Sequence, residues 1–156
     1  MIHIVDDEAV LREVLALIFA SLGYQTKVFS SPSAYLKFMA SDAYSSPKVL
    51  FTDLKMPGGI TGYELIGQVQ ASHPDQRCVV MSGFDSEPSA YKNLACMYLQ
   101  KPFFADKIRA VMAELKACDE NGACQLAVHA DCDVDDRALF CLQGWFCPHN
   151  MEESKR

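Results

Sequence analysis

Over the first 117 residues, short apolar runs alternate with longer amphipathic segments, and this alternation limits the fold more than any other feature. The apolar runs are rich in β-branched and aromatic residues and are bounded by polar or turn residues, which predicts strands. They occupy residues 2–5, 25–29, 48–52, 77–81 and 97–100. Between them, apolar residues recur at helical spacing. Because parallel strands need crossover connections, we expect an α/β fold with a parallel sheet covered by helices on both faces.

Four of the connecting segments have clear helical patterns, at residues 8–23, 31–41, 62–72 and 105–117. In the first, one broad apolar face is predicted from Val10, Leu11, Val14, Leu15, Leu17 and Ile18. Gly23 supplies its stop, and Ser31-Pro32 supplies a cap and a first-turn proline for the second. The apolar faces of the other two helices are predicted from Leu65, Ile66 and Val69, and from Ile108, Val111, Met112 and Leu115.

Polar residues follow the apolar runs at the carboxyl ends of the predicted strands, which is where ligands bind in such folds. The first run is followed by Asp6 and Asp7, the third by Asp53, the fourth by Ser82 and the fifth by Lys101. Clustered carboxylates are costly unless neutralised, and a hard cation such as Mg²⁺ takes oxygen ligands. Lys101 and Ser82 would bind phosphoryl oxygens, and Asp53 would attack phosphorus as the nucleophile.

These residues lie in four motifs, "IHIVDDE", "FTDLKMPGG" with Gly62 beyond it, "VVMSG" and "YLQKPF". With their order, the chain resembles a two-component response regulator receiver domain over about three-quarters of its length. The resemblance implies a five-stranded, doubly wound parallel sheet of the flavodoxin-like receiver fold, in the order 2-1-3-4-5. It covers residues 1–117, with residues 118–156 as a small C-terminal extension.

The resemblance also implies a role for each motif residue. Asp53 would be the phosphoacceptor and, with Asp7 and the Lys55 backbone carbonyl, a direct ligand of Mg²⁺ or Mn²⁺, while Asp6 would hold the metal largely through water. Ser82 and Lys101 would contact the acyl phosphate, and the Lys101-Pro102 bond would be cis. Tyr98 would be the aromatic switch.

Each residue also has a plainer interpretation when taken alone. Asp6 and Asp7 are suitable N-terminal capping residues for the helix that follows. Ser82 fits a turn, Tyr98 fits packing, and Lys101 fits a solvated surface. His3, inside the first apolar run, is expected in the core without a chemical role.

The function implied is a phosphorylation-switched signalling module that takes its phosphoryl group from a histidine kinase or a histidine phosphotransfer protein. It would act through contacts with an output protein and would catalyse only its own phosphorylation and dephosphorylation. Two alternatives remain open at this stage. One is a phosphate sink with rapid autodephosphorylation, and the other is a receiver scaffold that carries a redox-sensing or metal-sensing extension.

Two spacings depart from the family pattern. Gly62 lies nine residues after Asp53, where eight are common, so the intervening loop is one residue longer. Ser82 and Lys101 are 19 residues apart, about three fewer than usual, and Pro88 lies between them. We therefore expect the fourth helix of the fold, within that interval, to be shorter by nearly a turn. Since this helix contributes to the family's usual output face, a homodimer or a partner complex by the standard route is put in question.

The extension differs from the receiver in composition. It holds 8 acidic and 3 basic residues, against 12 and 11 in residues 1–117, and five of the seven cysteines. Its apolar residues, Trp145 and Phe146 among them, are too many for a plain disordered tail, so we expect it to pack on the receiver. A short helix is predicted within residues 135–145. Zinc or iron–sulfur ligation remains an alternative for Cys124, His129, Cys132, Cys141, Cys147 and His149, although no Cys-x-x-Cys pair is present.

Composition also limits location and partners. There is no apolar run long enough for a membrane span and no secretory signal, so we expect a cytoplasmic protein. Thiols in the cytosol stay reduced, which argues against a disulfide framework. No cluster of Lys and Arg offers a phosphate-backbone footprint, so direct nucleic-acid binding is not expected.

Overall fold

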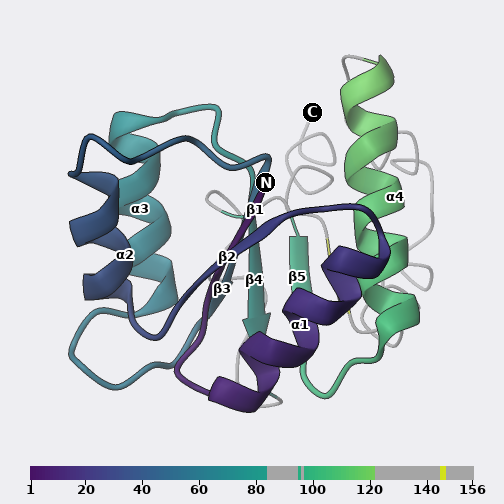
Figure 1. The fold of residues 1–156 in the computed structure, drawn as a ribbon, viewed down its shortest axis with the longest axis horizontal. Helices are drawn as coiled ribbons and strands as arrows, with labels where there is room; N and C mark the ends of the chain where they lie inside the picture. The colour runs from purple at the N-terminus through teal and green to yellow at the C-terminus, as the bar shows by residue number, and fades with distance from the viewer. Residues whose placement is uncertain (84–94, 96, 122–144, 147–156) are drawn as a thin grey trace, which may run out of the picture.

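The five predicted strands form one parallel sheet, in the predicted order, in a computed structural model that describes residues 1–83, 95, 97–121 and 145–146 (Figure 1). The sheet order is β2-β1-β3-β4-β5-β6, where β6 is an additional short strand. The parallel strands are β1 (Ile2–Val5), β2 (Thr26–Phe29), β3 (Val49–Asp53), β4 (Cys78–Ser82) and β5 (Met97–Gln100). Asp53 and Ser82 are the last residues of β3 and β4. The sequence pattern predicts them directly after these strands.

Four helices within the described residues cover the two faces of the sheet. They are α1 (Ala9–Ser21), α2 (Pro32–Met39), α3 (Gly62–Ser72) and α4 (Ala105–Asn121). Figure 1 shows α2 and α3 on one side of the sheet and α1 and α4 on the other. Two separate apolar cores result, one beneath each helix pair. Because β1, β3 and β4 are covered on both sides, all of their residues are buried, as their mostly apolar sequences predict.

Helix α1 buries a narrower face than the sequence predicts. Leu15 and Phe19 are fully buried, and Leu11, Ile18 and Leu22 pack beside them. The predicted inclusion of Val10, Val14 and Leu17 in the buried face is wrong, since all three are exposed. The apolar residues of this segment extend around more of the helix than one sheet can cover, so a second apolar stripe is left facing outward.

The helix boundaries follow from local capping. The Ser31 side chain accepts a hydrogen bond from the Ala34 amide at the start of α2, with Pro32 in the first turn as predicted. At the start of α3, Thr61 and Glu64 form a reciprocal capping box. Gly23 follows α1 with a φ of 81°, a backbone conformation that favours glycine.

The described part of the extension adds one strand to the sheet. Strand β6 (Trp145–Phe146) pairs antiparallel with β5, so this segment does return to the receiver. Trp145 therefore lies in a strand and not at the end of the predicted helix, whose other residues, 135–144, lie outside the described residues. The candidate zinc and iron–sulfur ligands lie outside them as well, as do Pro88 and the interval in which a shorter fourth helix is predicted. Helix α4 continues to Asn121, four residues past the boundary predicted at residue 117.

In the part of the chain that the structure describes, no helix has the length and apolar character that crossing a membrane requires. The cytoplasmic location expected from the sequence remains a prediction.

Candidate functional site

Three carboxylates gather at the carboxyl edge of the sheet. Strands β1 and β3 are parallel neighbours with Val5 opposite Thr52, so Asp6 and Asp53 emerge side by side. Carboxylate oxygens of Asp6, Asp7 and Asp53 lie within 4.8 Å of one another. Asp6 and Asp53 are buried and Asp7 is exposed. The three acidic residues singled out in the sequence therefore form one cluster that opens to solvent at Asp7.

Lys101 supplies the positive charge of the cluster. Its Nζ lies 2.9 Å from Asp6 Oδ2 and 3.3 Å from Asp53 Oδ1. The residue directly follows β5, its backbone amide donates to the Ser82 carbonyl, and the Lys101-Pro102 bond is cis, as the resemblance implied. Lys101 is thus an ion-pair partner within the site and not a residue of solvated surface.

Backbone amides hold two of the carboxylates in place. The Glu8 amide donates to Asp6 Oδ1 at 2.9 Å, and the Leu54 amide donates to Asp53 Oδ1 at 2.8 Å. The residue that caps α1 is Glu8, without a side-chain cap hydrogen bond, so Asp6 satisfies the amide of the capping residue and is not itself the N-cap. Arg12 donates to the Asp6 carbonyl oxygen and closes the first turn of the helix over the strand end.

Burial and charge act against each other in this cluster. Burial raises the pKa of Asp53, the attraction of Lys101 opposes this rise, and the like charge of Asp6 adds to it. For Lys101, burial alone would lower the pKa, but the hydrogen bond to Asp6 and the charges of Asp53 and Asp6 outweigh it, so the pKa stands above its ordinary value. Lys101 therefore stays protonated, while a negative charge on Asp53 is held at a cost.

The cluster suits a hard divalent cation. Carboxylate oxygens are the ligands that such ions prefer, and here three side chains converge on one point with solvent access at Asp7. A dication would also offset the burial of negative charge at Asp53. Asp6, Asp7 and Asp53 are the residues that would hold it. Lys55 is exposed in the loop after β3, and its carbonyl remains a predicted ligand.

Ser82 and Tyr98 lie on β4 and β5, the two strands that follow β3 in the sheet. Ser82 ends β4, which neighbours β3, and is buried. Tyr98 is buried in β5, and its hydroxyl donates to the Gly83 carbonyl oxygen at 3.3 Å. The proposed switch side chain is therefore tied to the residue that follows the proposed phosphate contact.

Gly62 has a structural role that its place in the motif did not reveal. Its amide donates to the Leu54 carbonyl at 2.9 Å, so α3 begins against the strand end that carries Asp53. A β-carbon at this position would overlap the Asp53 carbonyl oxygen and lie 2.9 Å from the Asp53 carbonyl carbon. The preceding Gly58 and Gly59 have φ values of 111° and 86°, which allow the longer loop to turn. The glycine that follows the motif around Asp53 was the available signal for this contact.

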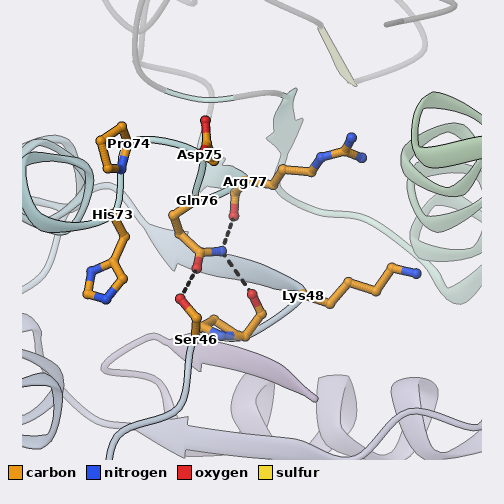
Figure 2. A pocket seen from close by; sticks show the side chains of 8 residues that line it. Ser46, Lys48, His73, Pro74, Asp75, Gln76 and Arg77 are labelled. Carbon is orange, nitrogen blue, oxygen red and sulfur yellow. Dashed lines mark hydrogen bonds between the residues drawn. The ribbon is translucent and has the colours of Figure 1, made fainter. Parts of the chain in front are cut away.

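The opposite end of the sheet holds a pocket of about 360 Å³ between the segments that lead into β3 and β4 (Figure 2). Its lining includes Ser46, Lys48, His73, Gln76 and Arg77. The Gln76 amide accepts a hydrogen bond from Ser46 and donates to the carbonyl oxygens of Pro47 and Arg77. The Gln76 amide thus connects the two segments that lead into β3 and β4.

A doubly wound parallel sheet with an acidic cluster and a paired lysine at its carboxyl edge defines a receiver domain. The family model described as "Response regulator receiver domain" matches residues 2–113, and the chain belongs to this family.

Relatives and solved structures agree with this assignment. The chain is 33% identical over 115 residues to the DNA-binding transcriptional regulator NtrC of Escherichia coli (strain K12), covering 72% of this chain and 24% of that protein. It is 31% identical over 141 residues to the transcriptional regulatory protein FixJ of Rhizobium meliloti (strain 1021), covering 86% and 62%. The receiver domain of NtrX from Brucella abortus superposes with a TM-score of 0.66 at 27% identity, covering 74% of this chain and 97% of that one. The chain thus spans about a quarter of the length of the NtrC relative.

Proposed function

We propose that this protein is a phosphorylation-switched response regulator that accepts a phosphoryl group on Asp53. The main support for this proposal is the position of the Asp53 side chain. Asp53 lies at the centre of a cluster that combines two further carboxylates with a lysine ammonium 3.3 Å from Asp53 Oδ1. Such a group of charges binds and neutralises phosphoryl oxygens while presenting a carboxylate as nucleophile. Membership of the receiver family supports the same function.

The two oxygens of Asp53 have different contacts. Oδ1 accepts a hydrogen bond from the Leu54 amide and faces Lys101, which supports Oδ2 as the oxygen that attacks phosphorus. A bond forms between Oδ2 and phosphorus as the phosphorus–nitrogen bond of a phosphohistidine breaks, and the bond's electron pair leaves with the imidazole. Lys101 stabilises charge on the transferred phosphoryl oxygens. Mg²⁺ held by Asp6, Asp7, Asp53 and the Lys55 carbonyl would neutralise the remaining charge.

The signal would pass through Ser82 and Tyr98. A phosphoryl group adds roughly −1.5 to −2 charge and three acceptor oxygens beside the end of β4. Movement of Ser82 toward one of these oxygens would shift Gly83, whose carbonyl accepts the Tyr98 hydroxyl. Tyr98 would then change position, and the phosphorylated state would be read by a partner that prefers it.

The exposed stripe of α1 fits a docking surface for the phosphodonor. Val10 and Leu17 are 65% and 73% exposed, and Val14 lies between them at helical spacing. Phe104, three residues after Lys101, is 75% exposed. Apolar side chains gathered beside a reactive site indicate a protein contact. Because α1 begins next to Asp7, a histidine kinase or histidine phosphotransfer protein bound there would bring its phosphohistidine to Asp53.

The remaining parts of the proposal concern output and location. The protein would work in the cytoplasm, would signal through an output protein and would catalyse no reaction other than its own phosphorylation and dephosphorylation. Two relatives are named as transcriptional regulators, but the chain matches only part of each. We therefore assign protein contact, and not nucleic-acid binding, to this chain.

The test is phosphorylation by acetyl phosphate in Mg²⁺, followed by phosphate-affinity electrophoresis. Asp53→Asn should abolish the shifted species because the amide is not a nucleophile. Asp42→Asn, at an exposed carboxylate outside the cluster, is the matched control and should be labelled like the wild type. Full labelling of Asp53→Asn would refute the assignment.

Two measurements separate the proposed switch from the alternatives. A lifetime of Asp53 phosphate of many minutes supports a switch, whereas a lifetime of seconds would indicate a phosphate sink. Elemental analysis of the purified protein addresses the sensing extension, since a stoichiometric amount of zinc or iron would favour a metal site there.

A further inference from the structure

The β5 edge of the receiver sheet is covered by strand β6 of the chain's own extension. Strand β6 pairs antiparallel with β5, in an otherwise parallel sheet, with Phe146 opposite Tyr98 and Trp145 opposite Leu99. Without β6, β5 would be an edge strand that presents unpaired amide and carbonyl groups. Such an edge is a template for pairing with another extended segment.

The paired residues of β5 are close to the reactive site in both sequence and structure. Tyr98 and Leu99 precede Lys101, whose Nζ contacts Asp6 and Asp53. On the other side of β5, Met81 of β4 pairs with Leu99 and also with Asp53 of β3. Only one strand thus separates β5 from the strand of the phosphoacceptor. A displacement of the carboxyl end of β5 would therefore weaken the hydrogen bonds between β5 and β6.

The pairing is short enough to be exchanged. It involves two residues on each strand, and each backbone hydrogen bond contributes a net of about 1 kcal/mol. An interaction of this size holds the segment in the resting protein, yet a differential interaction of similar size can release it. A longer strand would have made the same contact permanent.

We propose that β6 is an internal inhibitor of the β5 edge, and that phosphorylation of Asp53 releases it so that an extended strand of an output protein can pair there. The coupling rests on the proposed function. In the resting state Lys101 is held by Asp6 and Asp53. In the phosphorylated state, phosphoryl oxygens bind Lys101, which follows β5, and Ser82, which ends β4. Movement of these two residues displaces the carboxyl end of β5 away from β6. By linkage, β6 must in turn disfavour the phosphorylated state.

Trp145 makes this proposal directly measurable because it is the only tryptophan in the chain. The experiment uses the full chain, with and without acetyl phosphate and Mg²⁺, and follows Trp145 emission together with hydrogen exchange of the Tyr98 and Leu99 amides. Successive amides of a strand point to opposite neighbours, so one of these two amides faces β6 and the other faces β4. Phosphorylation should change the emission and accelerate exchange of the amide that faces β6 by about tenfold, the effect of losing one to two hydrogen bonds.

A proline variant separates pairing from phosphorylation. Phe146→Pro removes a backbone donor from β6 and keeps Trp145 as reporter. It should accelerate exchange of the β5 amide that faces β6 by about tenfold without any phosphorylation. Glu152→Pro, which places a proline in the extension outside β6, is the matched control and should behave as the wild type.

Each outcome bears on a distinct statement. Equal β5 exchange in wild type and Phe146→Pro would overturn the pairing. Phosphorylation that leaves emission and exchange unchanged would overturn the coupling while the proposed function stands. Failure of the chain to take up phosphate would refute the proposed function and the coupling together, and the unphosphorylated exchange data would still decide the pairing. Protection that depends on protein concentration would assign β6 to a second copy and overturn the internal contact.

Discussion

Replacing Gly62 with alanine should displace Asp53, the proposed phosphoacceptor. A β-carbon at residue 62 would overlap the Asp53 carbonyl oxygen, and it would lie 3.1 Å from the Leu54 α-carbon. All of these neighbours are backbone atoms at the end of a buried strand, so no side chain can rotate to relieve the contact. Either the end of β3 or the start of α3 must move.

The magnitude follows from comparing two glycines of the same helix. Overpacking against rigid surroundings costs about 1–3 kcal/mol, so Gly62→Ala should lower the free energy of unfolding by at least this range. Gly67 lies in the middle of α3 with nothing within 4 Å of an added β-carbon. Gly67→Ala should therefore raise the free energy of unfolding by about 0.5–1 kcal/mol through helix propensity. The two alanine variants should differ by about 1.5–4 kcal/mol.

Urea denaturation and acetyl phosphate labelling provide the assay. Displacement of a reacting group by about 1 Å can cost on the order of 100-fold in rate, so Gly62→Ala should be labelled at least about tenfold more slowly than Gly67→Ala. The reasoning fails if the two variants unfold within about 0.5 kcal/mol of each other and are labelled at the same rate.

Two further predictions concern buried charge. Lys101→Met should lower the free energy of unfolding at pH 7 by about 3 kcal/mol, because it leaves buried Asp6 without its cation, and added Mg²⁺ should restore part of the loss; equal urea midpoints for variant and wild type would contradict this. Burial, with the charge of Lys27 second, lowers the pKa of His3 from 6.5 to about 4. The unfolded chain therefore binds a proton that the folded chain excludes, and His3 should cost the wild type about 2 kcal/mol of stability between pH 7 and pH 5. His3→Gln should lack that part of the pH dependence, and parallel stability curves would show that His3 has no such effect.

The sheet was predictable because its signals are local and mutually consistent. The strands of residues 2–5 and 48–52 are mostly apolar, without the polar alternation of a strand that faces water on one side, and this is typical of a strand covered on both faces. The buried faces of α3 and α4 were also predicted correctly, since each has a single narrow apolar stripe. Helix α1 was not, because its apolar residues extend around two sides and the sequence does not reveal which side meets the sheet. Strand β6 has no signal of its own, as a two-residue pairing depends on the edge it meets.

The site was predictable as a set of residues but not as a set of contacts. Position after an apolar run brought together Asp6, Asp53 and Lys101, since parallel strands end at the same edge. The closer pairing of Lys101 with Asp6 than with Asp53 depends on side-chain geometry, which spacing does not encode. Likewise, the bond from Tyr98 to Gly83 required the structure. His3 was placed in the core correctly, and its hydrogen bond to Tyr35 explains how a polar ring is accommodated there.

The Gln76 amide that connects the segments before β3 and β4 indicates where the protein can be labelled or immobilised. It fixes the end of the sheet that lies opposite the carboxylates, roughly 15 Å away along β4. Asp75, exposed in the adjoining turn, is therefore a suitable point for attaching a dye or a sensor chip. A molecule immobilised there would keep Asp53, α1 and the β5 edge free to meet their partners, so that phosphorylation and strand exchange can be recorded on a single surface.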